Sequence, residues 1–168
     1  MITESFYEKA DLEQWLKPNI HREDYKELTD KLWGPLVEKN LSFLIKDKVT
    51  DAPVGVALNF DAHDEPEVNI ASKLEVVFEF LEHLEGPIRD NKLPLGKGKV
   101  LHSFMMATHP DLNYQQNVEV IQFMENEVLN LAKSRGFAGI FTTNTNPLTQ
   151  VLTISYQYKK IIPGHSPK

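Results

Sequence analysis

The chain carries a strand, a turn and a long amphipathic helix in direct succession between residues 100 and 136. Residues 100–108 form an apolar run of strand length, and His109-Pro110-Asp111 is a turn sequence. The helix that follows has one apolar stripe at helical spacing, formed by Val120, Ile121, Met124, Val128 and Leu131. Gly136 is expected to end it. Because the strand and the helix each have a face to bury, this segment predicts a sheet covered by a helix.

Three more helices are predicted from apolar residues at helical spacing and from the residues that end them. They span residues 5–16, 22–32 and 70–85, with a single helical turn at 36–40. Trp33-Gly34-Pro35 is expected to end the second helix and Gly86-Pro87 the third. The reason is that proline removes a helix donor and clashes with the preceding turn.

Four further strands are predicted, at residues 41–47, 54–61, 137–143 and 151–158. The first two form a hairpin around a polar loop. The order of strands and helices predicts a mixed α/β layer fold with helices on a central sheet. No internal repeat or linker divides the chain, so residues 1–168 are expected to form a single domain.

Composition excludes several classes of function. The net charge of −6 argues against nucleic acid as the main partner, because phosphate binding needs clustered lysine and arginine. The absence of cysteine excludes disulfides, thiolate metal sites and a cysteine nucleophile. No apolar run approaches a membrane span, and the first residues lack a signal-peptide layout. We therefore expect a cytoplasmic protein that does not bind membranes, and a monomer.

The strand–turn–helix unit resembles the acyl-donor unit of the Gcn5-related N-acetyltransferases. In that fold the turn carries Arg/Gln-x-x-Gly-x-Gly/Ala, whose small residues let backbone N–H groups approach the pyrophosphate of coenzyme A. With His109-Pro110 aligned on the family's usual His-Pro, the pattern positions hold Asn113, Gln116 and Val118, so both glycines are absent. The resemblance implies a three-layer fold with a central, mostly antiparallel sheet and helices on both faces. It also implies a donor unit without its pyrophosphate cradle.

A more specific resemblance is carried by residues 54–61 (VGVALNFD), 81–88 (LEHLEGPI), 100–117 and 136–150 (GFAGIFTTNTNPLTQ). From its start to about Gln150 the chain is similar to the C-terminal amine-selecting domains of the Ebony-type β-alanyl-amine synthetases of insects. This implies a nonribosomal peptide synthetase in which a carrier domain holds β-alanine as a 4′-phosphopantetheine thioester. The last domain then joins it to an amine such as dopamine or histamine. The implied fold is that of insect arylalkylamine N-acetyltransferases.

The chain departs from that family after Gln150. Ebony-type domains are expected to continue with a Leu-Gly turn and a pair of closing strands beside the amine site. Here residues 151–158 supply at most one strand, and residues 159–168 contain two prolines and a glycine.

Glu8 is the residue that the resemblance assigns as proton acceptor for the attacking amine. In insect arylalkylamine acetyltransferases a glutamate after a Phe-Phe pair has this role, and here Phe6-Tyr7 precedes Glu8. Asp11 is the second candidate. The alternative is that Glu8 is simply an exposed helix residue, as most glutamates are.

The donor arm is expected to lie along the strand at residues 100–108, bonded to its backbone as an added strand would be. Phe104, Met105 and Met106 would flank the arm, and Gln115 and Gln116 would meet its outer end in the turn. The alternative is that these apolar side chains belong only to the core.

Contacts to the amine are expected from Asn59 and Asp61 at the end of a hairpin strand. Thr143 and Asn144 are further candidates, because they follow a strand at the sheet edge where ligands collect in α/β proteins. His102 is a weaker candidate, as most lone histidines have structural roles. No metal is expected, because the cluster Asp61-Ala62-His63-Asp64-Glu65 has no partner cluster with ligand spacing.

Two other functions remain open from the sequence. An acetyl-CoA-dependent arylalkylamine N-acetyltransferase would share the fold, although the missing glycines argue against it. A domain without catalysis that only binds a carrier protein or an amine is the other alternative.

Overall fold

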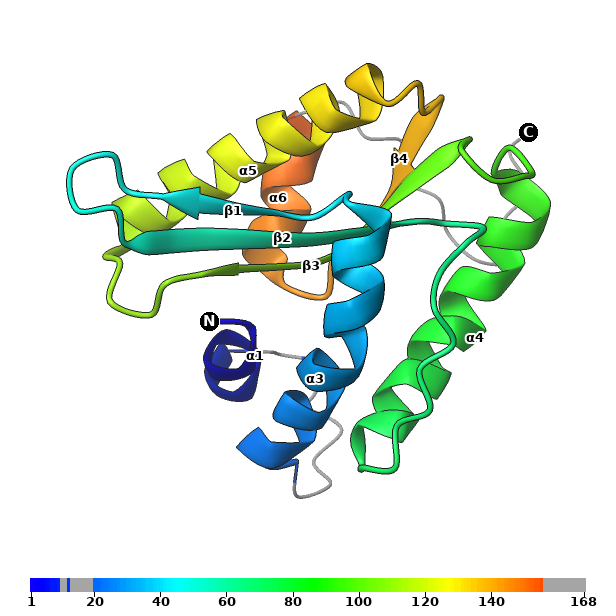
Figure 1. The fold of residues 1–168 in the computed structure, drawn as a ribbon, viewed down its shortest axis with the longest axis horizontal. Coiled ribbons are helices and arrows are strands. Elements are labelled where there is room, and N and C mark those ends of the chain that lie inside the picture. The colour runs from blue at the N-terminus through cyan, green and yellow to red at the C-terminus, as the bar shows by residue number, and fades with distance from the viewer. Residues whose placement is uncertain (10–11, 13–19, 156–168) are drawn as a thin grey trace.

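The computed structural model describes residues 1–9, 12 and 20–155 (Figure 1). The elements in chain order are α1 (Ile2–Lys9), α3 (Arg22–Lys39), β1 (Phe43–Lys46), β2 (Pro53–Asp61), α4 (Leu74–Lys92), β3 (Val100–Thr108), α5 (Tyr114–Ser134), β4 (Gly139–Phe141) and α6 (Pro147–Ser155). The second half of the predicted first helix, at residues 10–16, lies outside the described residues except for Leu12, which is helical.

The four strands form one sheet in the order β1-β2-β3-β4. Both β1–β2 and β2–β3 are antiparallel, and β3–β4 is parallel. Helices α1, α3 and α4 cover one face, and α5 and α6 cover the other (Figure 1). The predicted mixed α/β fold, with a mostly antiparallel sheet between two helical layers, is confirmed.

Each face of the sheet has its own core. On the first face, Phe60 of β2 packs with Tyr25 and Leu28 of α3 and with Leu74 of α4. On the second face, α5 buries the stripe that its sequence predicts, including Met124 and Val128. The helix is long because it has a face to bury along most of its length, which is where most helical stability comes from.

A bulge interrupts the pairing of β2 with β3. Leu58 pairs with Met105, whereas Asn59 pairs with Ser103, so Phe104 is the extra residue. Because a bulge breaks the strict alternation of sides, Phe104 and Met105 both pack against the α1–α3–α4 core.

Two predicted helix ends are wrong. α3 continues through Trp33-Gly34-Pro35 to Lys39, and α4 continues through Gly86-Pro87 to Lys92. In both helices apolar residues beyond the proline are buried, namely Leu36 and Ile88. Burial on the far side offsets the roughly 3 kcal/mol that an internal proline costs.

The strand predicted at residues 151–158 is also wrong as far as the structure describes it, because residues 151–155 belong to α6. The Leu148 N–H donates to Asn146 Oδ1 at 2.9 Å, so Asn146 caps the helix, and Pro147 stands in its first turn. Asn followed by Pro is a helix-start signal that outweighed the alternation of side chains. Residues 156–158 lie outside the described part.

Gly55 is the point of closest approach between β2 and α5. A Cβ at this position would lie 2.8 Å from Val120 Cγ1 and 2.9 Å from Met124 Sδ. We expect Gly55→Ala to lower the free energy of unfolding by about 1–3 kcal/mol, because the helix must move away from the sheet. Urea denaturation measures this change.

Gly139→Ala is the matched control, since a Cβ on this strand residue would have no atom within 4 Å. We expect it to change the free energy of unfolding by at most about 0.5 kcal/mol. Equal effects of the two substitutions would contradict the described contact between β2 and α5.

Candidate functional site

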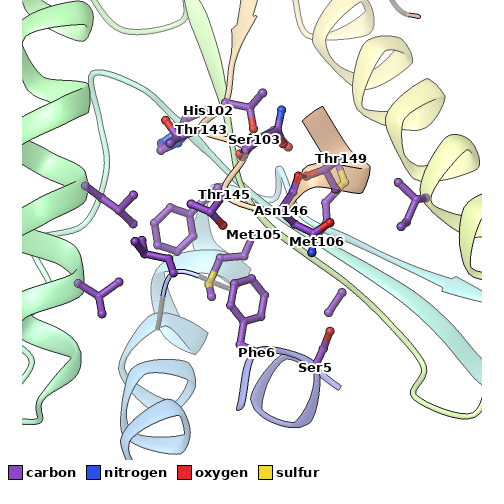
Figure 2. A pocket seen from close by; sticks show the side chains of 18 of the residues that line it. Ser5, Phe6, His102, Ser103, Met105, Met106, Thr143, Thr145, Asn146 and Thr149 are labelled. Carbon is purple, nitrogen blue, oxygen red and sulfur yellow. Dashed lines mark hydrogen bonds between the residues drawn. The ribbon is translucent and has the colours of Figure 1, made fainter. Parts of the chain in front are cut away.

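A cavity of about 290 Å³ lies between β3 and the segment that follows β4. Its walls come from β3, from residues 142–149 and from helices of both layers. Figure 2 shows Phe6 of α1 facing Met105 at one side, and Asn146 and Thr149 beside Met106 at another. A concave, mostly apolar pocket with a few polar groups is the usual form of a small-molecule site.

One backbone edge of β3 opens onto this cavity. β4 pairs with β3 only at Val100, Leu101 and His102. Beyond that point the Thr142 hydroxyl donates to the Ser103 carbonyl at 3.1 Å, and the chain then turns away into α6. In the part of the chain that the structure describes, no strand pairs with residues 103–108 on this side. An extended ligand can therefore add to this edge as a strand would.

His102 stands at the inner end of the open edge, between two glutamates. Its Nδ1 lies 2.6 Å from Glu65 Oε1, and its Nε2 lies 4.0 Å from Glu85 Oε2. The ring is 3% exposed and packs against the rings of Phe104 and Phe141. A carboxylate bonded to one nitrogen fixes the orientation of the imidazole. We call Glu65, His102 and Glu85 the Glu-His-Glu cluster.

Glu85 is a buried carboxylate of α4 that lines the cavity. Burial raises the pKa of its carboxyl group above the ordinary value, and this outweighs the lowering by His102 and by a hydrogen bond from Thr143. Figure 2 shows Thr143 beside His102. The groups around Glu85 therefore only partly compensate a negative charge on its carboxylate.

The N-terminus of α5, which a pyrophosphate would need, is occupied by its own side chains. Asn113 Oδ1 accepts from the Gln116 N–H, and Gln116 Oε1 accepts from the Asn113 N–H, both at 3.0 Å. Gln115 donates to Glu119 at 2.9 Å. These bonds use donors that in phosphate-binding helices face the ligand.

The structure brings six of the predicted site residues to the cavity: His102, Phe104, Met105, Met106, Thr143 and Asn144. It does not bring Gln115 and Gln116 there, since both are engaged in α5 itself.

Asn59 and Asp61 also lie away from the cavity lining. Asn59 is fully buried and donates to the Leu41 carbonyl at 2.8 Å. Asp61 accepts from the backbone N–H groups of His63 and Gly98. Asn59 thereby holds the segment before β1, and Asp61 holds the chain at His63 and Gly98. Contacts of these two residues to the amine stay a prediction.

Glu8 lies on the outer side of α1. Its side chain is 45% exposed, and Oε1 lies 3.4 Å from Arg22 Nη2. Its exposure is the one expected of an ordinary helix-surface glutamate. Ser5 and Leu12 do line the cavity. The role of Glu8 as proton acceptor stays a prediction, and Asp11 lies outside the described residues.

Sequence reasoning missed Glu65 and Glu85 as site residues. The pattern predicts that the helix ends at Glu85, whereas α4 continues to Lys92, and in the sequence Glu65 stands out only as a member of the Asp61–Glu65 cluster. In that cluster Asp64 pairs with Lys39 and Lys97, while Glu65 turns to His102. Among the described residues, no group of three or more potential ligands could hold a metal ion. No described helix is both long and apolar enough to cross a membrane.

Comparison with known proteins gives two informative matches, although no protein-family model matches the chain. Over 162 residues it is 57% identical to the β-alanyl-bioamine nonribosomal peptide synthetase Ebony of Drosophila melanogaster. That alignment covers 96% of this chain and 18% of the relative, so the chain spans less than a fifth of that protein's length.

The second match is the solved C-terminal condensation domain of Ebony in complex with β-alanyl-dopamine. It superposes with a TM-score of 0.92 at 58% identity, covering 95% of this chain and 75% of that one. An aminoglycoside N-acetyltransferase in complex with CoA matches at 9% identity and a TM-score of 0.46, which is too low to support an argument.

The buried charge of Glu85 predicts a pH-dependent effect of its removal. Folding raises the pKa of the Glu85 carboxyl group. The contribution of this group to the stability of the fold is therefore most favourable below its unfolded-state pKa, and it falls as pH rises through its folded-state pKa. Glu85→Gln should therefore raise the melting temperature at pH 7, and by less near pH 4. Calorimetry at both pH values measures this. Glu79→Gln, at an exposed position on the same helix, should change the melting temperature equally at the two pH values. If Glu85→Gln raises the melting temperature less at pH 7 than at pH 4, or lowers it more, the prediction is wrong.

Proposed function

Because the chain belongs to the family of the Ebony C-terminal condensation domain, we propose that it joins a carrier-bound β-alanyl thioester to a biogenic amine, such as dopamine or histamine. The product is a β-alanyl amide. The observation that carries the proposal is the match, at 58% identity, to a domain solved with β-alanyl-dopamine. A cavity on the open edge of β3 supports it, since this is where an extended donor can lie.

The reaction needs positioning more than a cofactor. The amine nitrogen attacks the thioester carbonyl, the C–S bond breaks, and the pantetheine thiol leaves while the amine loses its proton. In the proposed arrangement the arm bonds to the backbone of residues 103–108, as a strand would. Phe104, Met105 and Met106 then flank it. No metal ion and no redox cofactor takes part in the proposed reaction, because a thioester is already an activated acyl donor.

The proposed donor is a phosphopantetheine arm on a carrier domain rather than free coenzyme A. The mutual bonds of Asn113 and Gln116 support this, because they take up N–H groups that a pyrophosphate would use. The carrier domain of the same synthetase is the proposed partner. Location in the cytoplasm and a monomeric state stay predictions.

Glu8 is proposed to accept the proton of the amine, after its side chain leaves Arg22 and turns toward the cavity rim. Its place in the sequence between Ser5 and Leu12, which both line the cavity, supports this movement. Breaking the exposed ion pair with Arg22 costs Glu8 little stability, because a surface ion pair contributes less than about 1 kcal/mol to the free energy of folding.

The proposed function predicts amide formation by the chain itself. Mixed with β-alanyl-loaded carrier protein and dopamine, it should release β-alanyl-dopamine, measured by mass spectrometry. Acetyl-CoA with dopamine should give at least about tenfold less product per unit time. Equal or faster acetylation would establish an acetyl-CoA-dependent acetyltransferase instead, and binding of carrier or amine without any product would establish a binding domain.

Glu8→Gln should lower kcat about a hundredfold or more with little change in amine binding, because glutamine cannot accept a proton. Glu4→Gln is the matched control, since Glu4 is the other α1 glutamate that pairs with Arg22, at 3.0 Å, and it has no proposed role in proton transfer. It should retain nearly full turnover. Full turnover of Glu8→Gln would remove the assignment, and Asp11→Asn would then be the next variant to measure.

A further inference from the structure

We propose that the Glu-His-Glu cluster binds the ammonium group of the β-alanyl donor, and that Glu85 thereby selects β-alanyl over acyl groups that lack an amine. This inference rests on the proposed function and names a specificity-determining residue for it. The cluster places both glutamates beside the same imidazole, with His102 Nδ1 2.6 Å from Glu65 and His102 Nε2 4.0 Å from Glu85.

Among the described residues, no lysine or arginine faces the cavity as a cation for its carboxylates. The described lining contains four glutamates: Glu65, Glu82, Glu85 and Glu125. Glu82 is bonded to Arg89, which lies outside the lining, and Glu65 to His102. For Glu85 the ion-pair partner among the described residues is His102, whose Nε2 lies 4.0 Å from Glu85 Oε2.

An isolated buried carboxylate is costly unless a partner compensates its charge. The polar and charged groups that face Glu85 are His102 of β3, the Thr143 hydroxyl, Glu65 from the loop after β2, and Glu82 on its own helix. Two of these four are carboxylates and make the charge less favourable. A ligand ammonium placed here would meet at least two acceptors and would supply the compensation that the described protein lacks.

The direction of the donor arm brings the acyl group to this cluster. In the proposed arrangement the phosphate end of the arm lies at the Thr108 end of β3, where the chain leaves the sheet for α5. From Thr108 to Ser103 the edge spans five residue steps, roughly 16 Å at about 3.3 Å per step. An arm that runs along the edge therefore points its acyl end toward His102.

Of the two polar groups that the substrates could present to these carboxylates, the ammonium of the donor suits them better than the catechol of the acceptor. A catechol of the acceptor amine could donate hydrogen bonds to Glu85 but would leave its negative charge uncompensated. β-Alanyl differs from butyryl only in having an ammonium where butyryl has a methyl group. Donor selectivity is therefore the property that Glu85 should control.

The test compares two donors and two acceptors with wild type and Glu85→Gln. The donors are β-alanyl-pantetheine and butyryl-pantetheine, and the acceptors are dopamine and phenethylamine. We expect Glu85→Gln to lower kcat/KM for β-alanyl transfer by about ten- to a hundredfold, the size of a lost charged hydrogen bond. Butyryl transfer should be unchanged or faster, with either acceptor. Glu79→Gln, on the same helix but outside the cavity lining, should leave the ratio of the two donors as in wild type.

An equal loss with both donors, or a loss that appears with dopamine but not with phenethylamine, would overturn the proposal while the proposed function stands. If wild type forms no amide from either donor, the proposed function fails separately. In that case, calorimetry measures how tightly wild type and Glu85→Gln bind the two pantetheine thioesters. If wild type prefers the β-alanyl thioester and the variant does not, the assignment of Glu85 is supported. If wild type binds both thioesters equally, the assignment is overturned. Retained folding of the variant is checked by its melting temperature.

Discussion

The short pairing between β3 and β4 is the constraint on which the rest of the site depends. β4 contributes only Gly139, Ile140 and Phe141 to the sheet, and its pairing ends at His102. β3 continues to Thr108 on its other side, where β2 holds it. The result is a strand that is firmly fixed along one edge and open along the other. A backbone edge would normally be covered or paired, because unpaired N–H and C=O groups favour association with another chain. Here the helices of both layers enclose it as the wall of a cavity.

Two local features support this opening. The bulge at Phe104 directs consecutive side chains to one face, so that Phe104 and Met105 both reach the cavity and the core. The Asn146 cap begins α6 a few residues after β4, and the chain there turns away from β3. Because Leu148 and Leu152 pack with the α5 layer, the helix is held there by burial as well as by its cap.

The sequence predicts the parts of this arrangement that come from local periodicity. The strand at residues 100–108 and the stripe of α5 are regular, and the structure has both at the predicted places. The ends at Pro35 and Pro87 are not predictable in this way, since burial of Leu36 and Ile88 beyond the prolines depends on the tertiary fold. The place of Glu85 beside His102 is not predictable from local periodicity either. It depends on the continuation of α4 past Gly86 and on a contact between residues far apart in the chain.

The central claim is that the donor lies along the open edge of β3. Backbone NMR with β-alanyl-phosphopantetheine as the added ligand tests it most directly. If the donor lies along this edge, the largest amide shifts fall on residues 103–108, with His102 at their inner end and with small changes at Asn113 and Gln116. Shifts that concentrate at Asn113–Gln116, or on β1 and the outer edge of the sheet, with residues 103–108 unchanged, would contradict it.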